Sequence, residues 1–256
     1  MLRIARYVAI GDSSTEGLVD PDGRGGYIGW SRRLAQRIAA AQGAMEYANL
    51  AQKGLTTREI RDRQFGRALA LQPDLVSLFS GTNDVLARDF DVRAFATDTR
   101  LMQGAFRERG ATVITFTLPD LTPLLPMARR IAPRILDMNA ALREVCAETG
   151  ALYVDFAQYP VTTDARLWNP DRIHANAAGH ARIAEALAEA LEVAGASHVW
   201  SEPLPVQPPP STLRRALTET AWTLRYLVPF ALGNALLAGR RPAFKPGPVP
   251  HYTRIA

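Results

Sequence analysis

The sequence has 256 residues, and its 47% hydrophobic and 21% charged residues are typical of a soluble globular protein with a sizeable core and one main domain. Cys146 is the only cysteine, which excludes an internal disulfide and a cysteine metal cluster. The net charge of +5 is concentrated near the C-terminus, because from Pro203 onward seven basic residues oppose one acidic residue and give a net charge of +6. The preceding residues therefore sum to a charge of about −1. A nearly neutral body of this kind predicts no nucleic-acid partner.

The first predicted element leads directly to a serine. Residues 7–10 form an apolar run that is too short for a helix and predicts a buried strand. Gly11 allows a sharp turn, which puts Ser13 at the carboxyl end of this strand, where open α/β sheets bind ligands. Ser13 is therefore a candidate nucleophile, although the same residues suit an ordinary turn in which Ser13 caps a helix. Asp12 could act chemically, but a role in orienting the turn is preferred.

The next elements place a glycine near this serine. Residues 19–26 are rich in turn residues and predict a loop. They lack the lysine of a P-loop and the spacing of a dinucleotide fingerprint, so this loop is expected to border the substrate cleft and not to bind phosphate. After a helix that stops at Gly43, residues 45–50 predict a second strand. Thr56-Thr57-Arg58-Glu59 resembles a capping box that opens the next helix, which places Gly54 in the intervening turn.

A third predicted strand delivers an amide side chain to the same edge. Residues 74–79 are mostly apolar, and Gly81-Thr82-Asn83-Asp84 comes shortly after them. Asn83 is therefore a candidate donor to a developing oxyanion, and Asp84 is expected to brace its loop. Residues 118–133, rich in leucine and proline, predict a long loop that either walls the cleft or covers the core.

The order of elements predicts the fold class. Fourth and fifth strands are predicted at residues 112–117 and 151–156, and helices with apolar stripes separate the strands. This alternation predicts a three-layer α/β/α, flavodoxin-like sandwich with a central parallel sheet of about five strands. Right-handed crossovers then bring the carboxyl ends of all the strands, and the candidate residues with them, to one edge.

A base for the serine occurs late in the chain, in Asp171-Arg172-Ile173-His174. A serine hydroxyl needs a base to accept its proton, and the base needs a carboxylate to fix its tautomer. Asp171 and His174, three residues apart, can meet on one turn. His180 has no carboxylate at a matching spacing and is expected to be structural. The four histidines show no paired metal spacing, so no metal site is predicted.

Four blocks together carry a resemblance to the GDSL-type esterases and lipases of the SGNH hydrolase superfamily. They are Gly11-Asp12-Ser13-Ser14, with Ser14 in place of the usual leucine, Asn49 to Gly54, Gly81-Thr82-Asn83-Asp84, and Asp171-x-x-His174. The resemblance covers roughly residues 5 to 195. It implies an esterase with Ser13 as nucleophile, His174 as base and Asp171 as the residue that orients the base. It also implies an oxyanion hole from the amides of Ser13 and Gly54 and the Asn83 side chain, a small-molecule ester as substrate, and no cofactor.

The C-terminal part differs in character. The expected organisation is a hydrolase domain over residues 1–198, a proline-rich linker over 199–211 and a basic helical extension over 212–256, ending in an irregular tail from residue 242. The apolar stripe Leu213, Leu217, Ala221, Leu224 and Val228 must be covered, either by the body or by an anionic membrane surface, and packing on the body is preferred. The apolar run of the extension, residues 226–238, is too short to span a bilayer.

Two other classes of function stay open at this point. One is a binding or scaffolding protein without turnover on the same fold. The other is a membrane-peripheral protein that works mainly through its basic C-terminal helix. Because the N-terminal residues lead straight into the first strand and show no secretory signal, a cytoplasmic location is expected.

Overall fold

The computed structural model describes residues 3–208, 211, 218–227 and 251–256. Strands and helices alternate along most of the chain, as the sequence predicts. The strands are β1 (Arg6–Gly11), β2 (Met45–Asn49), β3 (Leu75–Phe79), β4 (Thr112–Phe116), β5 (Leu152–Val154) and β6 (Thr253–Ile255). The α-helices are α1 (Ser13–Glu16), α2 (Gly29–Gln42), α3 (Thr57–Ile60), α4 (Gly66–Ala70), α5 (Thr82–Leu86), α6 (Val92–Glu108), α7 (Ala132–Thr149) and α8 (Ala177–Ala190).

The sheet has the strand order β5-β4-β3-β1-β2-β6. The first five strands pair in parallel, which confirms the predicted parallel sheet. All residues of β3 are buried, because helices cover both faces of the sheet and leave no solvent side for polar alternation. Because β1 pairs in parallel with both β2 and β3, the carboxyl ends of these three strands lie next to one another.

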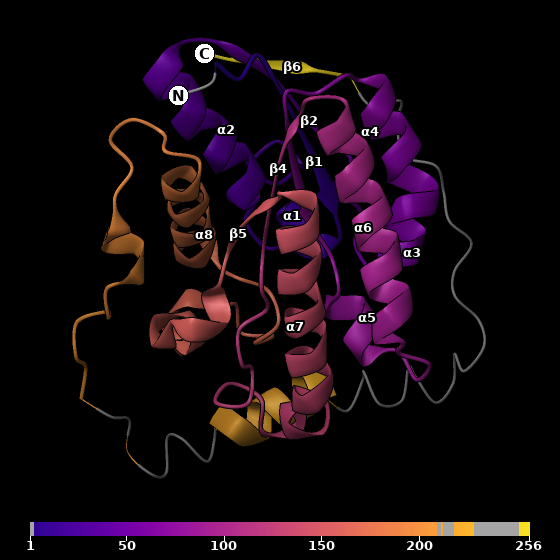
Figure 1. The fold of residues 1–256 in the computed structure, drawn as a ribbon. Coiled ribbons are helices and arrows are strands. Elements are labelled where there is room, and N and C mark those ends of the chain that lie inside the picture. The colour runs from indigo at the N-terminus through magenta and orange to yellow at the C-terminus, as the bar shows by residue number, and fades with distance from the viewer. Residues whose placement is uncertain (1–2, 209–210, 212–217, 228–250) are drawn as a thin grey trace.

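The helices form two layers around the sheet. Helix α2 packs against α8 on one face, and α6 packs against α7 and α3 on the other (Figure 1). The stripe predicted for α2 is buried, since Trp30, Leu34 and Ile38 are each 0% exposed. The three-layer α/β/α arrangement is therefore confirmed.

The prediction of an irregular tail is wrong for the last described residues. Thr253–Ile255 form β6, which pairs antiparallel with β2 and covers the edge of the sheet. Ile255 is 7% exposed, and the adjacent Tyr252 packs against the core and donates to the Leu71 carbonyl oxygen at 2.8 Å. β6 pairs with backbone groups of β2 that would otherwise lie unpaired at the edge of the sheet.

Residues 218–227 of the extension are helical, and they lie at the carboxyl end of the sheet below α7 (Figure 1). Trp222 packs against the core, whereas Leu224 is 64% exposed. The expected burial of the leucine stripe is wrong at Leu224, because the helix turns its aromatic side chains toward the body instead. The stripe members Leu213, Leu217 and Val228 lie outside the described residues, as does the second helix expected beyond Pro229.

Packing on the body continues as far as Trp200. Trp200, in the short 3-10 helix His198–Ser201, is 5% exposed and lies edge-on to Phe156, with 5.5 Å between the ring centroids.

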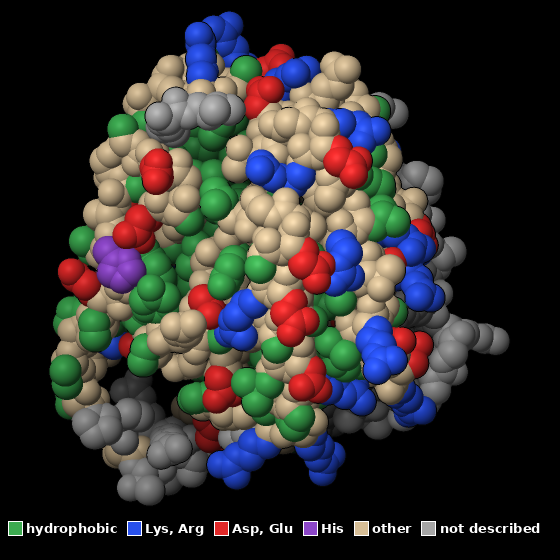
Figure 2. Space-filling model, in the orientation of Figure 1, with side chains coloured by type: hydrophobic (Ala, Val, Ile, Leu, Met, Phe, Trp, Pro, Cys, Tyr) green, Lys and Arg blue, Asp and Glu red, His purple; other side chains and the backbone are tan. Residues whose placement is uncertain are grey.

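Basic and acidic side chains are interspersed over the face drawn in Figure 2, in keeping with the nearly neutral body. None of the helices in the described ranges has the length and apolar character that crossing a membrane requires.

Candidate active site

The turn after β1 is shaped by Gly11. A Cβ atom on this residue would lie 2.5 Å from the carbonyl oxygen of Phe79 and would also collide with Thr15, so only glycine fits here. Gln64 holds the same residue, because its side chain accepts from the Gly11 amide and donates to the Gly11 carbonyl, each at 2.8 Å. Ser13 begins α1 directly after this fixed point.

Asp12 orients the turn, as preferred from the sequence. Its carboxylate accepts a hydrogen bond of 3.0 Å from the Ser14 amide and so caps α1. The residue is 1% exposed. Burial raises the pKa of Asp12 to about 7, although the Ser14 amide and the nearby charge of His174 oppose this rise.

The structure brings Ser13, His174 and Asp171 together. The Ser13 Oγ lies 2.8 Å from the His174 Nε2, and the His174 Nδ1 lies 2.9 Å from the Asp171 Oδ2. The other carboxylate oxygen of Asp171 accepts from the backbone amides of Ile173 and His174, at 2.9 and 3.0 Å. A single Asp thus holds both the backbone and the ring of the histidine.

The electrostatics of Asp171 match this arrangement. Burial alone would raise its pKa, but the hydrogen bond from the His174 ring and those from the His174 and Ile173 amides outweigh it and lower the pKa to about 2. The carboxylate is therefore ionised at neutral pH. An ionised Asp171 favours the tautomer with hydrogen on Nδ1, which leaves Nε2 free to accept the Ser13 proton.

Asn83 and Gly54 lie in the turns that follow β3 and β2. Asn83, in α5, donates to the carbonyl oxygen of Leu55 at 3.1 Å and lies 3.4 Å from the Asp12 carboxylate. Gly54 lies in the turn before α3, with a φ of +80°. A Cβ atom there would meet nothing within 4 Å, so backbone conformation rather than space favours glycine at this position.

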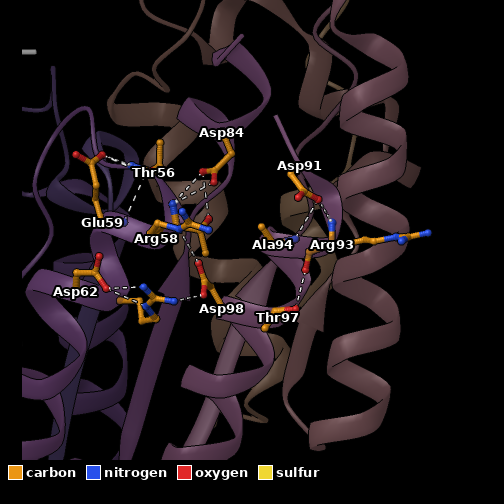
Figure 3. Close-up of polar contacts among 12 residues, drawn as sticks. Thr56, Arg58, Glu59, Asp62, Asp84, Asp91, Arg93, Ala94, Thr97 and Asp98 are labelled. Carbon is orange, nitrogen blue, oxygen red and sulfur yellow. Dashed lines mark hydrogen bonds and ion pairs between the residues drawn. The ribbon is translucent and has the colours of Figure 1, made fainter. Parts of the chain in front are cut away.

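A polar network braces these two turns against each other (Figure 3). Asp84, next to Asn83, accepts from the Thr57 amide at 3.0 Å and from the Thr57 hydroxyl at 3.1 Å. Thr56 and Glu59 form the predicted capping box at the start of α3. Asp84 therefore joins the Asn83 turn to the helix that follows Gly54, which is the bracing role expected for it.

His180 lies apart from this arrangement. It is 1% exposed, and its Nδ1 accepts a hydrogen bond of 3.2 Å from the Trp30 amide. Burial lowers the pKa of His180 to about 4, mainly by disfavouring the charged ring. This histidine is structural, as expected.

An apolar cavity of about 70 Å³ lies beside the site. Phe79, Phe116, Phe156 and Trp200 form part of its lining, and neighbouring pairs in this series have ring centroids 4.0, 5.2 and 5.5 Å apart. The sequence neighbours of Ser13, Asn83 and His174 also contribute to the lining: Ser14, Thr82, Ile173 and Ala175.

The sequence reasoning missed this aromatic lining, although a signal was present. Phe79 and Phe116 are the last residues of β3 and β4, and Phe156 follows β5 closely, so the parallel topology brings all three rings to the carboxyl edge. The loop predicted for residues 118–133, expected either to wall the cleft or to cover the core, does both. Leu118 is 5% exposed and also lines the cavity.

The part of the chain that the structure describes contains no group of three or more His, Cys, Asp or Glu side chains arranged to hold a metal ion.

A three-layer α/β/α sandwich with a serine, a histidine and an aspartate at the carboxyl edge of its sheet is the architecture of an SGNH-type ester hydrolase. The chain belongs to the GDSL-like Lipase/Acylhydrolase family, which it matches over residues 9–182. The expected family and a carboxylic ester hydrolase activity are thereby confirmed.

Individual relatives agree with this membership. The chain is 27% identical over 207 residues to an acetylxylan esterase of Geobacillus stearothermophilus, a match that covers 71% of this chain and 91% of the relative. Its fold is similar to that of LAE5, an α/β hydrolase from the metagenome of Lake Arreo, Spain, with a TM-score of 0.63 and 23% identity over 74% of this chain and 95% of LAE5. A variant of Axe2, an acetyl xylan esterase from Geobacillus stearothermophilus, has a TM-score of 0.61 and 20% identity over 75% of this chain and 98% of that protein.

Proposed function

We propose that this protein cleaves carboxylic esters through an acyl-enzyme intermediate on Ser13. His174 acts as the base and Asp171 orients it. The continuous hydrogen-bonded series from the Ser13 Oγ through the His174 ring to the Asp171 carboxylate, with separations of 2.8 and 2.9 Å, carries this proposal. These separations allow proton transfer without rearrangement of the side chains.

The reaction takes place in two steps. As the Ser13 Oγ attacks the ester carbonyl carbon, the His174 Nε2 accepts the hydroxyl proton, and the carbonyl oxygen becomes an oxyanion. The intermediate collapses, the bond to the alcohol oxygen breaks, and the alcohol leaves with the proton from His174. Water then attacks the acyl-Ser13 ester in the same way and releases the carboxylic acid.

The oxyanion is stabilised by the amides of Ser13 and Gly54 and by the Asn83 side chain. Ser13 is the first residue of α1, so its amide has no acceptor within that helix. Gly54 has a φ of +80°, a left-handed conformation that suits a tight turn with an amide free to donate. The network around Asp84 keeps the Gly54 and Asn83 turns in place before the charge develops.

The substrate is a small-molecule ester whose acyl group enters the apolar cavity beside Ser13. Five aromatic side chains line this cavity, and such a lining favours hydrocarbon over a charged group. The curated relative is named an acetylxylan esterase, so an acetylated xylan is one substrate to compare. Membership in a family of ester hydrolases does not favour the alternatives of a non-catalytic or mainly membrane-binding protein.

A series of chromogenic esters from acetyl to decanoyl, together with acetylated xylan, tests the proposal on the purified protein. We expect hydrolysis that Ser13→Ala lowers by roughly 10⁴- to 10⁶-fold, as for other enzymes that lose a triad member. Retention of the parent rate by Ser13→Ala or His174→Ala would contradict the mechanism.

A further inference from the structure

Arg172 lies between Asp171 and His174, but its side chain points away from them to the C-terminal segment 218–227. Its two terminal nitrogens donate to the two carboxylate oxygens of Glu219, at 2.9 and 2.6 Å. The guanidinium carbon lies 4.7 Å from the centroid of the Trp222 ring. Arg172 also donates to the carbonyl oxygen of Leu124 at 3.2 Å. Three separate parts of the chain thus meet on this one side chain.

The backbone of Arg172 gives these contacts a consequence for the site. Its φ is +62°, in the left-handed region that side chains other than glycine and asparagine rarely adopt. The bend at this residue lets the amides of Ile173 and His174 fold back onto the Asp171 carboxylate. A strained conformation persists only where its surroundings hold it, and the anchored Arg172 side chain supplies such a hold.

The pair between Arg172 and Glu219 has the geometry of a strong ion pair. The Arg172 side chain is 17% exposed and Glu219 is 47% exposed, so water screens the pair only in part. Both oxygens of the carboxylate are engaged, which fixes the orientation of the guanidinium group as well as its position. Trp222 covers the face of the guanidinium group and adds a cation–π contact.

We propose that the C-terminal segment 218–227 positions the Asp171–His174 turn for catalysis, with Arg172, Glu219 and Trp222 as positioning residues. This inference rests on the proposed function. Segment 218–227 lies beyond residue 182, where the family match ends, so the device belongs to this chain's own extension. Without the segment, the turn is free to move, and the His174 Nε2 spends less time in line with the Ser13 Oγ.

The proposal predicts which kinetic constant changes. Arg172, Glu219 and Trp222 are outside the lining of the apolar cavity, so substrate binding is left as it is. We expect Glu219→Gln to lower kcat about 10- to 100-fold, because a misplacement of about 1 Å at a catalytic group has an effect of this size. KM should change less than about twofold, since the loss affects the transition state and not the bound substrate.

Glu148→Gln is the matched control. Glu148 also pairs with an arginine, at 2.5 Å from Arg100, but it lies on α7, and both side chains are about half exposed. Arg172→Asn and Arg172→Ala together test the role of the left-handed backbone conformation at this residue. Arg172→Asn should keep a higher kcat than Arg172→Ala, because asparagine accepts the left-handed conformation more readily.

The charge-exchanged pair Arg172→Glu with Glu219→Arg tests the ion pair itself and should recover part of the kcat that either single change removes.

Steady-state kinetics of these variants and of Ser13→Ala on one chromogenic ester separate the outcomes. A fall in kcat for Glu219→Gln that Glu148→Gln does not share supports the positioning role. Equal kcat values in the two variants, with an activity that still depends on Ser13, overturn the positioning role alone. So does a rise in KM at constant kcat, since that result makes segment 218–227 a substrate contact. Activity that survives Ser13→Ala overturns the proposed function and this inference with it.

Discussion

The Asn83 side chain donates a hydrogen bond of 3.1 Å to the Leu55 carbonyl oxygen and so ties the turn after β3 to the turn after β2. One of its two amide hydrogens is committed to this bond. The contact with the Asp12 carboxylate, at 3.4 Å, is longer than an ordinary hydrogen bond, so the second hydrogen is held weakly. That hydrogen is the one available to an oxyanion.

Replacing Asn83 by alanine should therefore slow acylation without preventing it. The loss of one oxyanion donor costs about 2.7 to 4 kcal/mol, or roughly 100- to 1,000-fold in kcat. Steady-state kinetics on an aryl ester measure the effect, and thermal unfolding checks that the two turns stay joined. An effect confined to KM would remove Asn83 from the oxyanion hole.

Gly54→Ala tests the backbone at the second donor. A Cβ atom at Gly54 meets nothing within 4 Å, so any cost comes from its φ of +80°. We expect a loss of about 1 to 2 kcal/mol in unfolding free energy. We also expect a lower kcat, because relief of the strain rotates the Gly54 amide.

Gly66→Ala is the control for that variant. Gly66 begins α4 and also has open space around it, but its backbone is helical, with a φ of −60°. Alanine should stabilise this position by about 0.5 to 1 kcal/mol. Equal stabilities for the two glycine variants would show that Gly54 is not under conformational constraint.

His180 should make stability depend on pH. Its pKa is lowered from 6.5 to about 4 by burial, so between these values the unfolded chain binds more protons than the folded protein. The stability from a neutral His180 is therefore fully present above about pH 6.5 and is lost as the pH falls toward 4. The loss should reach about 3 kcal/mol.

Urea denaturation of the parent and of His180→Asn at several pH values measures this loss. The Asn side chain can still accept from the Trp30 amide but does not titrate. The difference in unfolding free energy between the two proteins cancels the contribution of Asp12 and other shared groups. Parallel curves for the parent and His180→Asn would contradict the assignment.

The parallel sheet, and the places of the candidate residues on it, could be predicted because their signals are local. β1, β2 and β3 are short and mostly apolar, and the parallel topology puts the turns that carry Ser13, Gly54 and Asn83 at one edge. Asp171 and His174 meet because three residues make one turn. In each case the information lies within a few residues of the element concerned.

The remainder depends on contacts that leave no local pattern. β6 has only three residues, and its backbone pairing with β2 leaves no apolar period in the sequence. Arg172 and Glu219 are 47 residues apart, and neither is unusual in its own surroundings. The leucine spacing predicted burial of Leu224, which is exposed, whereas Trp222 of the same segment contacts Arg172.

The most direct test of the account is to label the protein with a fluorophosphonate probe and to locate the adduct by mass spectrometry. Such probes react with a serine whose hydroxyl is activated by a base. We expect one adduct, on Ser13, and expect labelling to be lost in His174→Ala. An adduct on Ser14, or no adduct in a protein that hydrolyses esters, would contradict the assignment of Ser13 as the nucleophile.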